Sequence, residues 1–305
     1  MWTELMLVMA ALATVQNGPG HETWSLHVPT AVARAAAGAE QTDTVFDVDP
    51  SARLEVRNHA GEIAVDTWDR EQIRVHASHS PRDGVEVERG GSVVTIRSES
   101  RGFGPPSMID FRITVPRTMA VNLSGPFSDM KVTGVRNDVS TETVKGFVTV
   151  RDCQGTVTAR SVEGVIDVAG VKGRVELATV DEAITLADIQ GAVHAETIDG
   201  DITMSGVDSR DVEARAVDGD VSYGGRIYDD GEYRLTTHDG DIVVAIPEGT
   251  NATVSVATFD GDFQADFPIQ VTQVEARRRF SFTLGSGGAR LELQSFDGDI
   301  RLKRP

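Results

Sequence analysis

Residues 146–181 read GFVTVRDCQ GTVTARSVE GVIDVAGVK GRVELATVD, which is four nine-residue units that each begin with glycine. The same period continues to Gly191 and Gly200, and Glu182 takes the one slot of that series without glycine. A short fixed period indicates that each unit is one structural step, which must stack on its neighbours to bury its apolar side chains. The repeat therefore decides the architecture.

Within each unit, numbered from its glycine, the apolar residues alternate with polar ones. Positions 3 and 5 are apolar, as in Val148 and Val150 or Ile166 and Val168, whereas positions 2, 4 and 6 are mostly polar. This period of two, in units rich in β-branched residues, predicts a strand with one buried face. Position 1 provides a residue that adopts a turn conformation. Each unit is thus predicted to be a short strand followed by a corner.

Position 7 carries a slower period. Hydroxyl residues occupy it in alternate units and Gly or Asp occupies it in the others, so the predicted coil is about 18 residues long and consists of two unlike halves. Like residues then stack in parallel about 4.8 Å apart, in two facing sheets. The predicted class is an all-β, parallel β-solenoid (β-helix). The alternating residues are Thr143, Ser161, Thr179 and Thr197 against Gly134, Asp152, Gly170, Asp188 and Gly206.

We divide the chain into a leader, residues 1–39, and one solenoid domain, residues 40–305. Within the solenoid, 40–127 are irregular coils, 128–218 regular coils and 219–305 enlarged coils; 40–60 and 290–305 are the expected end caps. The leader holds an apolar run at 5–15 and small-residue stretches that resemble signal-peptidase sites, although a basic start is missing. We interpret it as an imperfect export signal, with a disordered cytosolic tail as the alternative. No transmembrane segment is expected in the mature chain.

The composition is acidic and poor in aromatic residues, with a net charge of -18 and 6% aromatics. The chain has no strongly basic stretch that would follow a phosphate backbone, so nucleic acid is not an expected partner. The single cysteine, Cys153, precludes an intrachain disulfide. Other units carry Val or Ile at its repeat position, and we therefore expect Cys153 to be a small buried hydrophobe.

Three segments resemble the bacterial putative-adhesin family, a β-solenoid domain of unknown function. They are ARLEVRNHAGEIAVDTWD at 52–69, IVVAIPEGTNATVSVATFDGDF at 242–263 and LGSGGARLELQSFDGDIRL at 284–302. The resemblance covers the chain from Glu40 onward. It implies a non-enzymatic, exported module of the cell envelope, either secreted, periplasmic or at the cell surface.

The motif Asp-Gly-Asp recurs in the later units and has two interpretations. In the first, each Asp caps its own turn by accepting backbone N–H groups. In the second, the stacked carboxylates hold Ca²⁺, which prefers several oxygen ligands. Residues 181–262 contain 19 Asp or Glu and four Arg, a net charge of -15. The residues of this possible Ca²⁺ ridge are Asp199, Asp201, Asp218, Asp220, Asp239, Asp241, Asp260 and Asp262.

Binding is the leading functional class, and we assign no catalytic, cofactor-binding or metal-ligating residue. The stacked Thr and Ser hydroxyls and the acidic corners suit an envelope protein or a glycan as partner. The alternative is a carbohydrate-active β-helix enzyme, a lyase or hydrolase, that uses Asp residues of the 199–262 ridge such as Asp220 and Asp241.

Overall fold

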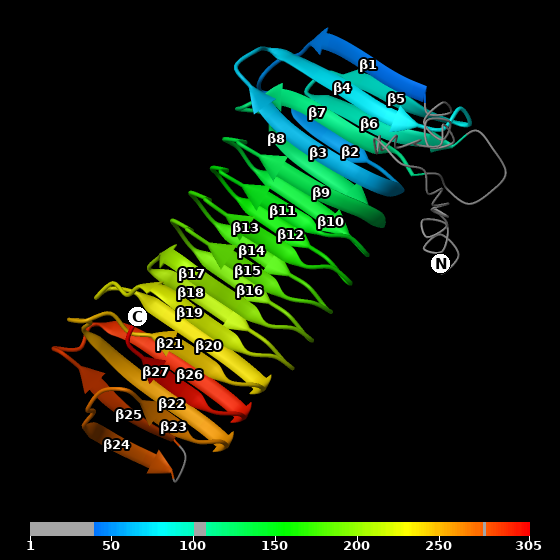
Figure 1. Cartoon of the computed structure of the whole chain (residues 1–305). Helices are drawn as coiled ribbons and strands as arrows, with labels where there is room; N and C mark the ends of the chain where they lie inside the picture. The colour runs from blue at the N-terminus through cyan, green and yellow to red at the C-terminus, as the bar shows by residue number, and fades with distance from the viewer. Residues whose placement is uncertain (1–39, 101–107, 277–278) are drawn as a thin grey trace, which may run out of the picture. The chain divides into compact units, whose positions relative to one another are not determined.

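The computed structural model of the protein describes residues 40–100, 108–276 and 279–305. Every regular element in these ranges is a β-strand, and the strands form two long sheets (Figure 1). The segment from Gly38 to Pro305 is one compact unit. The export signal predicted within residues 1–39 lies outside the described residues. In the ranges that the structure describes, no helix has the length and apolar character needed to cross a membrane.

The two sheets, called A and B, contain 13 and 14 strands. The strands of sheet A, in their spatial order, are β1 (Glu40–Asp47), β4 (Gln72–His79), β7 (Asp110–Pro116), β3 (Ala60–Trp68), β9 (Phe127–Thr133), β11 (Val148–Arg151), β13 (Ile166–Ala169), β15 (Ile184–Ala187), β17 (Ile202–Asp208), β19 (Val221–Arg226), β21 (Ile242–Ala245), β27 (Ile300–Lys303) and β23 (Phe263–Ala265). The strands of sheet B are β24 (Val271–Ala276), β25 (Arg279–Leu284), β22 (Ala252–Asp260), β26 (Ala289–Asp297), β20 (Glu232–Asp239), β18 (Asp211–Arg215), β16 (Val193–Glu196), β14 (Val175–Ala178), β12 (Val157–Arg160), β10 (Val139–Thr143), β8 (Ala120–Gly125), β2 (Arg53–Arg57), β6 (Val93–Ser100) and β5 (Asp83–Gly90).

The strand register confirms the 18-residue coil. In sheet A, Val148 of β11 is paired in parallel with Ile166 of β13, and in sheet B, Val157 of β12 is paired with Val175 of β14. Successive nine-residue units thus alternate between the two sheets, and each sheet repeats after two units. Like residues stack on like residues, as the sequence period predicts.

The core lies between the sheets and is filled by positions 3 and 5 of each unit. Ile166, Val168 and Val175 are fully buried, while the residues between them on each strand are only partly buried. Burying one such aliphatic side chain stabilises a fold by about 1.5–3 kcal/mol. Stacking of the coils is what provides this burial, since a single coil encloses too little apolar volume.

Both ends of the solenoid depart from chain order. The coil formed by β2 and β3 lies between β6–β7 and β8–β9, and the coil formed by β26 and β27 lies between β20–β21 and β22–β23. The prediction that residues 290–305 cap the solenoid is therefore wrong. The antiparallel pair β24–β25 covers the last coil of sheet B instead, and the chain end fills the position one coil further in. At the other end, β1 and β5 are the edge strands. The predicted cap of residues 40–60 is therefore confirmed only for β1, because β2 lies inside sheet B between β6 and β8 and the edge of that sheet is β5.

One corner of the regular coils has the left-handed backbone that the Gly and Asp residues of position 7 predict. Gly134, Gly170 and Gly206 have φ of 79°, 69° and 63°, and Asp152 and Asp188 have φ of 54° and 53°. Asp and Asn are the side-chain-bearing residues that adopt this conformation most readily. The alternation of Gly and Asp thus follows from the turn geometry.

Candidate functional site

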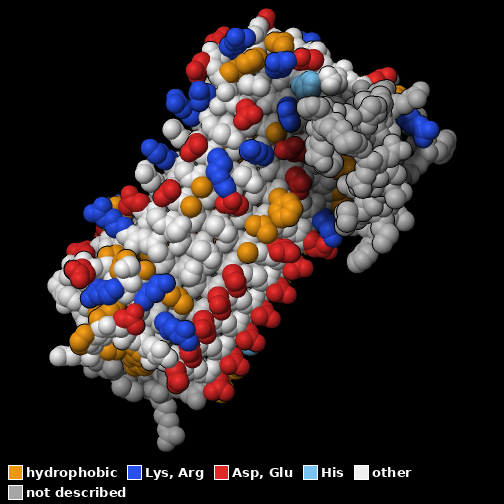
Figure 2. Space-filling model, viewed as in Figure 1, with side chains coloured by type: hydrophobic (Ala, Val, Ile, Leu, Met, Phe, Trp, Pro, Cys, Tyr) orange, Lys and Arg blue, Asp and Glu red, His pale blue; other side chains and the backbone are white. Residues whose placement is uncertain are grey.

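The Asp-Gly-Asp motifs stack at the opposite corner, where the chain passes from sheet B to sheet A. The residues at position 9, each of which precedes a glycine or, for Asp181, Glu182, pair in register from coil to coil and form what we call the position-9 row. Figure 2 shows carboxylates gathered in rows along the later coils. The members of the position-9 row are Glu163, Asp181, Asp199, Asp218, Asp239, Asp297 and Asp260.

The Asp residues that follow the glycines form a second row, the position-2 row, with a different role. Every carboxylate of the row except that of the last member, Asp262, accepts the backbone N–H of the equivalent Asp one coil further on, at donor–acceptor distances of 2.8–2.9 Å. For these four Asp residues the prediction that the side chain caps its own turn is wrong, because the side chains connect neighbouring coils. In order along the axis, the position-2 row is Asp201, Asp220, Asp241, Asp299 and Asp262.

These hydrogen bonds also bear on the catalytic alternative. The N–H of Asp262, with help from the guanidinium of Arg301, lowers the pKa of the Asp299 carboxyl. A general acid near neutral pH needs the opposite, a raised pKa. Asp220 and Asp241, the candidates for catalysis, lie in the same row, and each accepts a backbone N–H at 2.8 Å.

The glycines of this corner are required by close stacking of the backbone. Gly219 has φ of 145°, and a Cβ placed on it would lie 2.2 Å from the carbonyl oxygen of Gly200. Gly240 repeats the arrangement against Gly219, also at 2.2 Å. A side chain at these positions would push the coils apart, so the glycines are structural.

The predicted row of Thr and Ser hydroxyls forms at this corner but points inward. Thr237 and Ser295 are almost fully buried, and their hydroxyls donate to the carbonyl oxygens of Gly219 and Gly240 at 2.9 and 3.0 Å. Of the four predicted members, Thr143 and Thr197 likewise donate to a carbonyl oxygen of the neighbouring coil, Thr179 donates to Asp181 of its own turn, and Ser161 is buried without a hydrogen-bond partner among the described residues. The expectation that they contact a glycan is wrong, since a ligand in solvent does not reach them.

The residue after each hydroxyl, at position 8, is exposed and, except for His238, apolar, and we call this set the position-8 row. At the other corner the same repeat position is buried; Cys153 is fully buried there, as predicted, and burial raises the pKa of its thiol. In the position-8 row the apolar members are 41–63% exposed. The row runs beside the position-9 carboxylates and consists of Val144, Val162, Val180, Ile198, Val217, His238, Phe296 and Phe259.

The position-8 row ends in stacked rings beside a groove. The ring of Phe296 lies parallel to that of Phe259 and nearly parallel to that of His238, with centroids 4.7 Å apart in both pairs. This distance equals the strand spacing, because one ring comes from each of three neighbouring coils. The groove has a volume of about 500 Å³. The residues that line it include His238, Phe259, Phe296, Ala216, Ala257 and Arg279.

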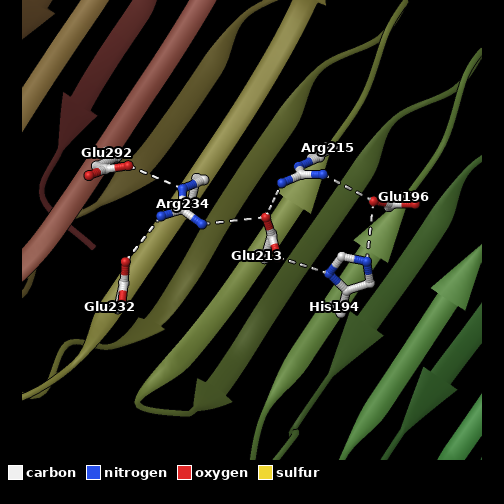
Figure 3. Close-up of polar contacts among 7 residues, drawn as sticks. All are labelled: His194, Glu196, Glu213, Arg215, Glu232, Arg234 and Glu292. Carbon is white, nitrogen blue, oxygen red and sulfur yellow. Dashed lines mark hydrogen bonds and ion pairs between the residues drawn. The ribbon is translucent and has the colours of Figure 1, made fainter.

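A network of charged residues crosses the outer face of sheet B (Figure 3). Arg234 on β20 contacts Glu292 on β26 and Glu232 on its own strand at 3.1 Å, and Glu213 on β18 at 3.5 Å. The hydrogen bond with Glu292 is the main cause of a raised pKa of Arg234. His194 continues the network at 3.2 Å from Glu213. Each such surface pair stabilises by about 0–1 kcal/mol, and because these groups are engaged with one another we assign the network a structural role.

The possible Ca²⁺ ridge does not form a cluster of ligands in the structure. Among the described residues, no group of three or more His, Cys, Asp or Glu side chains is arranged to hold a metal ion. The carboxylates instead lie in rows, and in the position-2 row one oxygen of every Asp except Asp262 is engaged by a backbone N–H. Ca²⁺ needs about six to eight oxygens around one point, and a single row does not provide that arrangement.

Comparison with known proteins identifies the family. The family model described as Toastrack DUF4097 matches residues 51–303. The chain belongs to this family. A search of curated proteins finds no match.

Solved structures similar to this Toastrack domain include two putative adhesins. One, from Bacteroides fragilis, is 13% identical, with 86% of this chain and 97% of that chain covered and a TM-score of 0.41. The other, from Parabacteroides merdae, is 12% identical, with 86% and 96% covered and a TM-score of 0.34. A putative cell adhesion protein from Clostridium sporogenes is 8% identical, with 87% and 100% covered and a TM-score of 0.23. The family assignment rests on the family model.

The sequence pattern located the acidic corner of the Toastrack domain but missed the position-8 row. Both halves of the coil carry an apolar residue at position 8, and hydrophobicity alone does not separate Val162, which is exposed, from Cys153, which is buried. The signal that separates them is the preceding residue. A hydroxyl at position 7 turns inward and leaves position 8 in solvent, whereas Gly or Asp at position 7 forms the left-handed turn and position 8 turns inward.

Proposed function

We propose that the protein is a non-enzymatic, exported, adhesin-like module of the bacterial cell envelope that binds an envelope protein or a glycan through the position-8 row. The observation that carries the proposal is the row itself. Exposed apolar side chains here are not scattered but follow one another from coil to coil beside a groove. Contiguous exposed apolar surface on a soluble domain marks an interaction site.

The position-2 row supports a binding function over a catalytic one. Its carboxylates connect the coils through backbone N–H groups, and the lowered pKa of Asp299 suits a permanently charged side chain. The glycines and buried hydroxyls of the same corner hold the backbone in place. Because this corner geometry repeats from coil to coil, it presents the position-8 and position-9 side chains on a rigid support.

Two measurements test the proposal. A C-terminally tagged full-length chain is expressed in a bacterial host and fractionated, with N-terminal sequencing of the product. We expect a processed chain outside the cytoplasm, and a cytosolic chain that retains Met1 would contradict export. For the enzymatic alternative, a polysaccharide panel is assayed for new reducing ends. Turnover by the wild type that is lost in Asp220→Asn and Asp241→Asn would overturn the non-enzymatic assignment.

A further inference from the structure

The partner of the position-8 row is constrained by the charge beside it. From Glu163 onward every member of the position-9 row is acidic, and the row continues for six coil steps to Asp260. Lys145, one coil earlier, is paired with Glu163 at 2.8 Å and marks the start of the acidic run. A partner that covers the position-8 row must therefore place cationic groups over the adjacent position-9 carboxylates. A second copy of this chain would bring its own carboxylates to that place.

The spacing of the two rows favours a helical partner. Coils repeat about every 4.8 Å, and a helix places side chains on one face about every 5.4 Å, so the two drift apart by about 0.6 Å per step. Over six steps the total mismatch is about 3.6 Å, or about 1.8 Å to either side of the centre. Long Lys and Arg side chains accommodate such a shift. An extended peptide repeats about every 6.7 Å on one face and loses register within about three steps.

The groove at the end of the row provides an anchor for the partner. The stacked rings of Phe259 and Phe296 line it together with small residues, Ala216 and Ala257. Its volume of about 500 Å³ accommodates a large apolar side chain. Arg279 lines the groove as well, so the groove carries a cationic side chain at the end of the acidic run. Binding sites commonly combine such a buried apolar anchor with a polar rim.

We propose that the position-8 row and its groove bind a cationic amphipathic helix of about 19 residues, with the apolar face of the helix on the row and its Lys or Arg residues on the position-9 carboxylates. The length follows from six steps of about 4.8 Å and a helical rise of about 1.5 Å per residue. This inference rests on the proposed function, since it names the partner class for the same surface. Helix-in-groove binding with anchors at i, i+3, i+4 and i+7 is an established mode of peptide recognition.

The test uses the full-length protein and synthetic fluorescein-labelled peptides in fluorescence anisotropy. The probe is a 19-residue Leu/Lys amphipathic helix, and its control is an isomer of the same composition without an apolar face. We expect the helix to bind at least tenfold more tightly than the isomer and to weaken with added salt. Equal binding of the two peptides would overturn the inference, because it would reduce the interaction to net charge.

Matched variants locate the binding surface. The triple variant Asp199→Asn, Asp218→Asn, Asp239→Asn removes three charges from the position-9 row. Its control, Glu62→Gln, Asp66→Asn, Glu86→Gln, removes three exposed charges near the other end of the solenoid. We expect about tenfold weaker binding in the first and less than twofold change in the second, with thermal melts checking that both are folded. Equal weakening would overturn the inference.

A separate variant keeps the inference testable if the Asn substitutions unfold the corner. Ile198→Ser with Val217→Ser shortens two exposed side chains and is expected to weaken binding of the Leu/Lys helix at least tenfold. Concentration-dependent dimerisation in sedimentation that these substitutions abolish would assign the row to a second copy and overturn the inference. If the wild type fails to bind the helix but is exported and binds cells, the partner class is wrong and the proposed function stands. Helix binding by a cytosolic chain would support the groove and contradict export.

Discussion

The slot without glycine in the nine-residue period should be a point of strain. Glu182 has φ of 100°, in the backbone region that glycine adopts, between stacked glycines of the neighbouring coils. A side-chain-bearing residue in such a region costs about 1–3 kcal/mol. Glycine in its place adds about 0.5–1 kcal/mol of unfolded-state entropy. We therefore expect Glu182→Gly to stabilise the fold by about 1 kcal/mol, a rise in melting temperature of about 2 °C for a body of this size.

The assay is thermal unfolding by differential scanning calorimetry, with two substitutions as controls. Gly200→Ala, at φ of 143°, would place its Cβ 2.3 Å from the Glu182 carbonyl oxygen, and we expect a loss of about 3 kcal/mol or more. Asp188→Gly, at φ of 53°, changes a conformation that Asp tolerates and should shift stability by less than about 1 kcal/mol. If Glu182→Gly leaves the melting temperature unchanged or lowers it, the argument from corner strain is refuted.

Three further predictions concern the same corner. Thr237→Val removes the buried hydroxyl that donates to Gly219 at 2.9 Å and should destabilise the protein by about 1 kcal/mol in urea unfolding; an unchanged midpoint would remove the hydroxyl row from the structural account. The pKa of Asp299 is lowered in the folded state by Asp262 and Arg301, so its stabilising effect is present above the ordinary value of 3.8 and is lost as pH falls through the lowered value. The stability difference between wild type and Asp299→Asn should accordingly shrink as pH falls from 5 to 2, and a difference that grows would contradict the sign. Because no cluster of metal-ligating residues forms in the described ranges, EDTA should leave the melting midpoint unchanged, whereas a drop in the midpoint would restore the Ca²⁺ interpretation.

The regular coils could be predicted from the sequence because each one depends on local chemistry. Alternation at positions 3 and 5 gives the buried faces of strands such as β13 and β14, and the alternation at position 7 gives the 18-residue coil. The glycine at position 1 marks the corner. All of these signals lie within two neighbouring units, so the repeat itself is sufficient to find them.

The ends of the solenoid could not be predicted in the same way because their pairing is non-local. The strand β27 is the last strand in chain order among the described residues. It nevertheless lies between β21 and β23, two strands that precede it in the chain by about forty to sixty residues. Nothing in its alternation of apolar and polar residues distinguishes an interior strand from a cap. The motif Asp297-Gly298-Asp299 was the available signal, since it matches the interior corners that it stacks between.

In the candidate site, too, some features could be predicted from the local sequence and others depend on the neighbouring coils. The acidic corner follows from composition, but the role of each Asp depends on the next coil, as the hydrogen bond from Asp241 N–H to Asp220 shows. Exposure of the position-8 row depends on whether the side chain of position 7 or that of position 8 is buried at the corner. In the sequence, only a hydroxyl at position 7 followed by an apolar residue at position 8 indicates that position 8 is exposed.

The most direct test of the account is binding of the purified protein to intact bacterial cells and envelope fragments. The wild type is compared with Ile198→Ser, Val217→Ser, Phe259→Ser and with a control, Thr149→Ala, Thr185→Ala, Thr203→Ala, which alters the outer face of sheet A. The account predicts that the first variant binds at least tenfold less tightly and that the control binds like the wild type. Undiminished binding by a folded position-8 variant would contradict the assignment of this row as the binding surface.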